Sequence, residues 1–167
     1  MTERETPQRP GREAAAGRRP GLVTIGWREW VALPELGIPR IKAKADTGAR
    51  SSALHAFDVE TDEGGDPPRV AFKVHPVQRD SSTVIECEAP LVGHRWVRSS
   101  TGRAMLRPVI RTTIRLDGRL VRTEVTLVRR DLMGFRMLLG RRLLKRKFLV
   151  DSGSSYLTEP SPKRVKR

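Results

Sequence analysis

The hydrophobic pattern between residues 21 and 156 is that of a chain of β-strands. Apolar and polar residues alternate, or β-branched and aromatic residues cluster, in short segments separated by turn-forming residues. The acidic, Gly- and Pro-rich segment Glu60–Pro68 is predicted to be a loop, and Leu91–Val97 to hold a turn and a strand. The other predicted strands are Leu22–Trp30, Arg40–Ala45, Val70–Val74, Thr83–Cys87 and Phe148–Val150.

A β-hairpin centred on Asp117-Gly118 is the clearest local prediction, because this dipeptide favours the two-residue turn with positive φ. Ile114 then pairs with Val121, and Arg111 lies opposite Glu124 as a favourable pair of opposite charges. Side chains alternate between the faces of a strand. The predicted core face is Ile110, Ile114, Leu116, Val121, Val125 and Leu127, and the predicted solvent face is Arg107, Arg111, Arg115, Arg122 and Glu124.

A single domain is predicted over residues 21–156, with a disordered leader at 1–20 and a disordered basic tail at 157–167. Only Gly140–Lys147 has helical character. Many short strands, Gly-rich turns and one late helix indicate an all-β fold, a small closed barrel with one short C-terminal helix.

The charge of the chain is strongly positive, with 33 Lys and Arg against 19 Asp and Glu and a net charge of +14. Residues 103–151 contain fourteen basic and four acidic side chains, which concentrates the charge in this part of the chain. Such a field attracts nucleic acid, acidic peptides or an acidic protein face. The alternative interpretation is that these arginines cover solvated strand faces without any ligand.

Several classes of protein do not fit this sequence. One cysteine forms no disulfide within the chain, no apolar run is long enough for a membrane span, and Met1–Gly21 has no signal-peptide core. A cytoplasmic protein with no membrane contact is therefore expected. His55, His75, His94 and Cys87 lack the paired spacing of metal ligands, and no phosphate-binding loop is present, so no metal and no cofactor is predicted.

Catalytic chemistry is suggested by Asp46-Thr47-Gly48-Ala49, which follows a predicted strand and resembles the active-site signature of aspartic peptidases. A second element of that signature, two hydrophobic residues and a glycine before a short helix, matches Leu138-Leu139-Gly140. Gly48 is expected to permit a tight turn that a Cβ would obstruct, and the Thr47 hydroxyl to bond a neighbouring loop. Asp46 is the predicted catalytic carboxyl, and Thr47, Gly48, Ala49, Leu139 and Gly140 are predicted to support it.

This chemistry needs two carboxyls that share one proton across a water molecule. Retroviral-type enzymes obtain the pair from two identical chains, so a homodimer is implied. Asp151-Ser152-Gly153 is a rival signature, but it is interpreted as a strand that ends in a turn, because too little chain follows to build a second lobe. Arg50, Ser51, His55, Arg107 and Arg141 are the predicted substrate-binding residues, with surface ion pairs, turns or packing as the alternatives.

Thirteen residues, Lys44–Ala56, together with Arg107–Ile110, Phe135–Arg141 and Phe148–Asp151, resemble a bacterial and archaeal family labelled "ATP-dependent zinc protease" that includes RimB-type proteins. The resemblance covers about residues 22–155. It implies a retropepsin-like barrel, peptidase activity, a functional link to an ATP-grasp glutamate ligase, and glutamate-rich tails as substrates. The label's zinc and ATP are not carried over. The alternative is a basic β-barrel that binds RNA, the ribosome or an acidic protein without catalysis.

Overall fold

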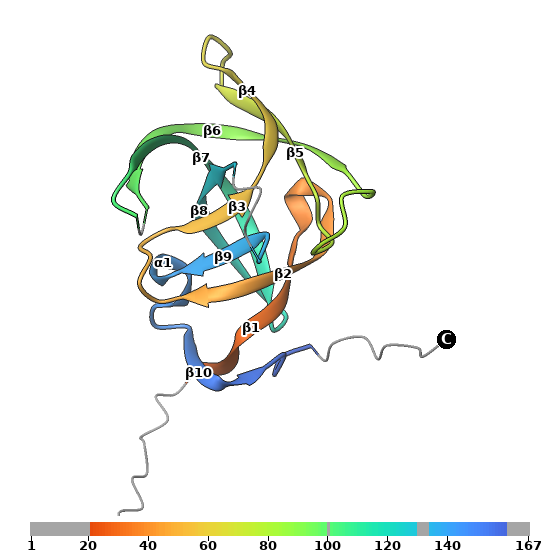
Figure 1. The fold of residues 1–167 in the computed structure, drawn as a ribbon, viewed down its shortest axis with the longest axis vertical. Coiled ribbons are helices and arrows are strands. Elements are labelled where there is room, and N and C mark those ends of the chain that lie inside the picture. Colours follow the sequence, from red (N-terminus) through yellow and green to blue (C-terminus); the bar gives the residue numbers. More distant parts are fainter. Residues whose placement is uncertain (1–20, 100, 130–133, 160–167) are drawn as a thin grey trace, which may run out of the picture.

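The computed structural model describes residues 21–99, 101–129 and 134–159. The predicted leader at 1–20 and residues 160–167 of the predicted tail lie outside this part of the chain. The described residues form one ten-stranded sheet, one 3₁₀ turn and one short α-helix (Figure 1). The elements are β1 (Val23–Leu33), η1 (Pro34–Leu36), β2 (Ile38–Asp46), β3 (Ser52–His55), β4 (Phe57–Asp62), β5 (Arg69–Val74), β6 (Ile85–Arg98), β7 (Ala104–Leu116), β8 (Arg119–Val128), β9 (Met137–Gly140), α1 (Arg141–Leu144) and β10 (Phe148–Ser155).

The sheet closes on itself. Its strand order is β10-β1-β2-β9-β3-β8-β7-β6-β5-β4, and β1 pairs in addition with β7 through Ala32 and Arg115. The run from β1 to β7 is therefore a ring, while β10 lies outside β1 and the strands β6, β5 and β4 continue beyond β7. This arrangement confirms the predicted all-β barrel with one short helix near its C-terminal end.

The predicted hairpin is confirmed as strands β7 and β8. Asp117 and Gly118 both have positive φ, 52° and 69°, as the two-residue turn requires. The predicted pairs form, Arg111 opposite Glu124 among them, and the predicted core face is buried. One residue differs: Arg107 was expected on the solvent face but is only 8% exposed. It lines a cavity with residues of β4 and β5, because the sheet extends past this end of the hairpin.

Two other local predictions were wrong. Glu60–Asp62 belong to β4 and pair with β5 rather than starting a loop. Leu91–Val97 holds no turn, since β6 runs through it as one strand with a bulge between Leu91 and Gly93. The short helix predicted within Gly140–Lys147 is confirmed as one turn, Arg141–Leu144.

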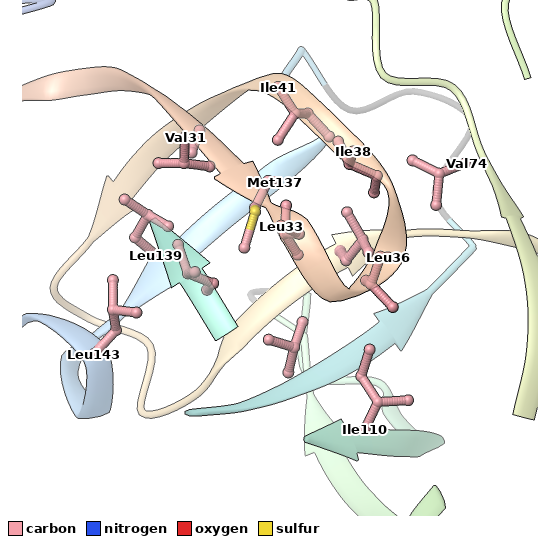
Figure 2. Close-up of a cluster of buried hydrophobic side chains, with 14 of the residues drawn as sticks. Val31, Leu33, Leu36, Ile38, Ile41, Val74, Ile110, Met137, Leu139 and Leu143 are labelled. Carbon is pink, nitrogen blue, oxygen red and sulfur yellow. The ribbon is translucent and has the colours of Figure 1, made fainter. Parts of the chain in front are cut away.

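The core of the barrel includes buried side chains of both strands that carry the signature motifs, β2 and β9 (Figure 2). Strand β9 sits between β2 and β3, parallel to the first and antiparallel to the second, so both of its edges are hydrogen-bonded. Its side chains Met137 and Leu139 are 0% and 1% exposed. Burial on this scale makes β9 a rigid support for whatever follows it. Neighbours in this cluster are Val31, Leu33, Leu36, Ile38, Ile41, Ile110 and Leu143.

A buried carboxylate holds the end of the described chain. Glu29 on β1 is 1% exposed and accepts hydrogen bonds from the backbone N–H groups of Gly26 (2.7 Å) and Leu157 (2.8 Å). The hydroxyl of Thr158 donates to its second oxygen at 3.0 Å. The described structure thus continues beyond the predicted domain boundary at residue 156, because this carboxylate fixes the segment that follows β10.

Candidate active site

The Asp46 loop connects the end of β2 to the start of β3. The backbone N–H of Ala49 donates both to the Asp46 carbonyl oxygen (3.2 Å) and to its Oδ1 (3.1 Å). The turn therefore fixes the carboxylate as well as the backbone. Asp46 is half-buried, whereas Thr47 and Gly48 are exposed, so the carboxyl lies near the surface in a defined orientation.

The glycine that packing requires in this region is Gly140 rather than Gly48. A Cβ on Gly48 would meet only Asp46 Oδ1, at an ordinary contact distance of 3.4 Å, so the predicted obstruction is absent. A Cβ on Gly140 would lie 2.5 Å from the carbonyl oxygen of Ser51, which is a backbone atom. The close approach of the second signature to the loop explains why a glycine ends β9.

The second signature is bonded directly to the loop. Asp46 and Gly140 are register partners in the parallel pair of β2 and β9. The Gly140 N–H donates to the buried hydroxyl oxygen of Ser52 (3.0 Å). At the start of α1, the N–H groups of Arg141 and Arg142 donate to the carbonyl oxygens of Ala49 (2.9 Å) and Arg50 (3.1 Å). These bonds satisfy groups that a helix leaves unpaired at its start, and they make the loop and the helix one unit.

Arg141 adds a side-chain brace to the same loop. Its Nη1 donates to the carbonyl oxygens of Thr47 and Gly48, each at 3.0 Å. A guanidinium carries five N–H donors in all, so these two contacts leave it capable of further bonds. The structure thus places this predicted substrate-binding residue against the Asp46 loop, where its side chain also holds the turn in shape.

A cluster of arginines that sequence reasoning mostly missed stands next to the loop. Arg95 of β6 donates through Nη1 to the Ser51 hydroxyl (3.1 Å) and through Nη2 to Glu124 Oε2 (2.6 Å). Arg142 donates to the same Glu124 oxygen (2.9 Å), and Arg111 lies 3.6 Å from the other oxygen. Only the Arg111–Glu124 pair could be found from the sequence, because it follows from hairpin register.

The charges of this cluster perturb its carboxyl. The hydrogen bond from Arg95, and after it the positive charges of Arg95, Arg142 and Arg111, lower the pKa of Glu124 from its ordinary value of 4.5, against the opposing effect of burial. The carboxylate is therefore ionised throughout the neutral range. Its three arginine partners stay positively charged as well.

A basic cavity of about 700 Å³ opens between the Asp46 loop, α1 and β10. Its wall is largely apolar where Leu144 and Phe148 line it. Four cationic side chains surround this apolar part: Arg50, Arg141, Arg142 and Lys145. The site therefore combines a fixed carboxylate loop with a neighbouring concave surface that suits an anionic or amphipathic chain.

Two predicted substrate-binding residues lie elsewhere. His55 is 2% exposed at the far end of β3, roughly 10 Å along the strand from the loop. Arg107 lines a separate cavity of about 910 Å³ together with Cys87 and His94. The structure brings together Asp46, the residues that follow it up to Ser51, Gly140 and α1. His55 lies at the opposite end of β3, where its backbone N–H donates to the Arg136 carbonyl oxygen (2.8 Å), and Arg107 lies at the other cavity.

The rival signature at Asp151 forms a closed local turn. Asp151 Oδ1 accepts the Gly153 N–H (2.9 Å), and Oδ2 accepts the Ser154 hydroxyl (2.7 Å). These bonds lower the pKa of the exposed Asp151 carboxyl, that from Ser154 most. Strand β10 neighbours β1, so Asp151 and Asp46 lie on strands that are not adjacent.

Neither a metal cluster nor a membrane helix is seen in the part of the chain that the structure describes. No three His, Cys, Asp or Glu residues among those described are grouped so as to hold a metal ion. None of the described helices is long and apolar enough to span a bilayer.

Burial raises the pKa of the Cys87 thiol to about 11, so this side chain is no nucleophile at neutral pH.

Comparison with known proteins agrees with this geometry. The RimB-like family model, described as retropepsin-like aspartic endopeptidase RimB, matches residues 24–161. The chain belongs to the RimB-like family. The match includes the Asp46 loop, β9 and α1, which together form the candidate site of this RimB-like chain.

Relatives of this RimB-like chain include longer proteins. It is 42% identical over 127 residues to a "Probable alpha-L-glutamate ligase" of Desulfotalea psychrophila, covering 76% of this chain and 27% of that protein. It is also 42% identical over 132 residues to a protein of the same name from Shewanella pealeana, covering 79% of this chain and 29% of the relative. The chain thus spans less than a third of the curated relatives it matches.

A solved structure shares the fold. The crystal structure of a Legionella pneumophila protein of unknown function matches with a TM-score of 0.68 and 25% identity, over 82% of this chain and 98% of that one. The barrel of the RimB-like chain therefore matches nearly the whole of that Legionella chain.

Proposed function

We propose that this chain is an aspartic peptidase with Asp46 as its catalytic carboxyl. The observation that carries the proposal is the interlocked loop, in which Ala49 orients the Asp46 carboxylate and Gly140 packs against the backbone of Ser51. A preorganised carboxylate lowers the cost of positioning the attacking water. One carboxyl of a pair takes a proton from the water, and the other donates a proton to the carbonyl oxygen of the scissile peptide.

The second carboxyl comes from a second copy of the chain. The sequence contains a single Asp-Thr-Gly, so one chain supplies one such carboxyl. A two-fold axis next to the exposed Thr47 and Gly48 would bring Asp46 of each copy to a common water molecule. Two carboxylates at about 3 Å separation do not both ionise readily, which keeps one of them protonated as the acid.

Glutamate-rich protein tails are the proposed substrates. The cations Arg50, Arg141, Arg142 and Lys145 around the cavity favour an acidic chain. Relatives that carry the same domain are named glutamate ligases, which supports a functional link to an ATP-grasp ligase that adds glutamates. A cytoplasmic setting fits the free thiol of Cys87.

Asp46→Asn is the variant that tests the function. Wild-type protein, Asp46→Asn and the matched control Asp151→Asn are incubated with glutamate-rich and mixed peptides, and products are identified by mass spectrometry. The proposal expects cleavage by wild type and Asp151→Asn, and a loss of at least about a thousandfold for Asp46→Asn. Light scattering is expected to give the mass of a dimer for all three proteins.

Two outcomes would overturn the proposal. Cleavage that survives in a folded Asp46→Asn protein removes this carboxyl from the chemistry. A wild-type protein that binds acidic peptides or RNA but cleaves no peptide in a broad library is instead a basic binding module, whose affinity falls steeply as salt is added.

A further inference from the structure

Three arginines from three separate elements converge on a single carboxylate. Arg95 comes from β6, Arg111 from β7 and Arg142 from α1, and all three lie within 3.6 Å of an oxygen of Glu124. The Glu124 side chain is 21% exposed, whereas those of the arginines are 34%, 51% and 40% exposed. The carboxylate is thus the inner part of the cluster, and the guanidinium groups face outward to solvent.

The charge of the cluster does not balance. One carboxylate against three guanidiniums leaves a surplus of two positive charges within a few ångströms. Exposed ion pairs contribute little to stability, and like charges held together oppose it, so stability alone does not explain this ratio. Guanidinium groups also keep donors in reserve, since each has five. A second carboxylate arriving from outside would complete the cluster.

The cluster touches the catalytic loop. The Arg95 guanidinium that binds Glu124 also donates to the hydroxyl of Ser51. Ser51 is the last residue of the Asp46 loop before β3. Arg142 holds the Arg50 carbonyl through its own backbone N–H and lines the basic cavity. An extended substrate seated over Asp46 and along the cavity would therefore pass beside these arginines.

We propose that Arg95, Arg111 and Arg142 form a subsite that binds a carboxylate side chain of the substrate, and that Glu124 positions them. This inference rests on the proposed peptidase function. It adds the residues that distinguish a glutamate from a glutamine at one position of the bound chain. Because Arg95 belongs to β6, the subsite would also include part of the β6–β7 hairpin. Trp96 and Leu106 of this hairpin are 69% and 50% exposed.

The first experiment compares two peptides that differ only in charge. One alternates Glu with Ala, and the other carries Gln in place of each Glu. Arg95→Gln and Arg142→Gln are expected to lower kcat/KM for the Glu peptide about tenfold or more, mainly through KM, and to leave that for the Gln peptide nearly unchanged. Arg115→Gln removes the same charge from an exposed site on β7 far along the hairpin, and is expected to change neither value. Equal losses on both peptides would overturn the subsite.

A binding experiment separates this inference from the peptidase proposal. Fluorescein-labelled versions of the two peptides are titrated by anisotropy into the Asp46→Asn protein, and into the same protein with Arg95 or Arg142 changed to Gln. A preference for the Glu peptide that disappears with Arg95→Gln supports the subsite even if the wild-type protein cleaves nothing. A preference that persists in Asp46→Asn/Arg95→Gln and Asp46→Asn/Arg142→Gln contradicts the subsite even if the wild-type protein is an active peptidase.

Glu124 needs its own test, because a positioning residue and a competitor for the subsite behave oppositely. Glu124→Gln is expected to reduce the ratio of Glu- to Gln-peptide affinity, and Glu124→Asp, which keeps the charge, to restore part of it. A Glu124→Gln protein that binds the Glu peptide more tightly would show that Glu124 merely occupies the site, and would overturn its positioning role.

Discussion

Gly140 lies directly opposite Asp46 in the parallel pair of β2 and β9, although the two residues belong to distant parts of the sequence. This pairing places the end of one signature motif against the start of the other. The backbone of Ser51 passes so close to Gly140 that no side chain fits between them. The Asp46 loop therefore depends on a glycine in another strand for its position.

Gly140→Ala tests this dependence. The new methyl group would lie 2.5 Å from the Ser51 carbonyl oxygen, so strand or loop must shift, and the free energy of unfolding is expected to fall by about 1–3 kcal/mol. Urea denaturation measures the loss. Gly48→Ala is the control, because its methyl group would meet only Asp46 Oδ1 at 3.4 Å. Equal effects of the two substitutions would contradict the close approach.

Glu29→Gln tests the clamp on the C-terminal segment. In wild type, the Leu157 N–H and the Thr158 hydroxyl donate to the buried Glu29 carboxylate. The glutamine amide would turn an N–H₂ group toward one of these donors, so the free energy of unfolding is expected to fall by about 1–3 kcal/mol. Limited proteolysis should then cut near Leu157 faster than in wild type. Glu35→Gln, which changes an exposed carboxylate paired with Arg122, serves as the control and is expected to have little effect. An unaltered cleavage rate near Leu157 in Glu29→Gln would argue against the clamp.

The arginine cluster predicts a pH dependence of stability. The pKa of Glu124 is lowered in the folded protein, chiefly by the hydrogen bond from Arg95, relative to its ordinary value of 4.5. A lowered pKa adds stability that is fully present above pH 4.5 and is lost as the pH falls through the folded-state pKa. The difference in unfolding free energy between wild type and Glu124→Gln should therefore be largest near neutral pH and shrink in acid. Denaturation curves at both conditions check this, and a difference that grows in acid would show the opposite sign.

Cys87 should react slowly with thiol reagents. Burial raises its pKa to about 11, so the thiolate is scarce at neutral pH, and the side chain is only 7% exposed. A chromogenic disulfide reagent is expected to label the native protein at least about tenfold more slowly than the urea-unfolded protein. Rapid labelling of the native state would mean that this part of the sheet opens readily.

Local chemistry in the sequence was sufficient for the β7–β8 hairpin and for the two signature motifs. The turn at Asp117-Gly118 and the alternation of apolar residues specify the same register, so the Arg111–Glu124 pair followed without any tertiary information. The same is true of Asp46 and Gly140, because a tight turn and a glycine before a helix are local features. The contact of Gly140 with Ser51 and Ser52 could not be predicted, because these residues are far apart in the sequence.

The tertiary structure alone decided which charged residues are buried, paired or grouped. Arg107 alternates with core residues like an exposed side chain, yet it is buried because the sheet continues past it through β4 and β5. Glu29 is a charged residue of β1. Its burial depends on the segment after β10, which folds back so that the Leu157 N–H bonds the Glu29 carboxylate. Arg95 and Arg142 reach Glu124 from elements that only the closed barrel brings together. The alternation of polar and apolar residues predicts which residues are neighbours within one hairpin. Which charged side chains are buried, and which of them meet, depends on how the barrel closes.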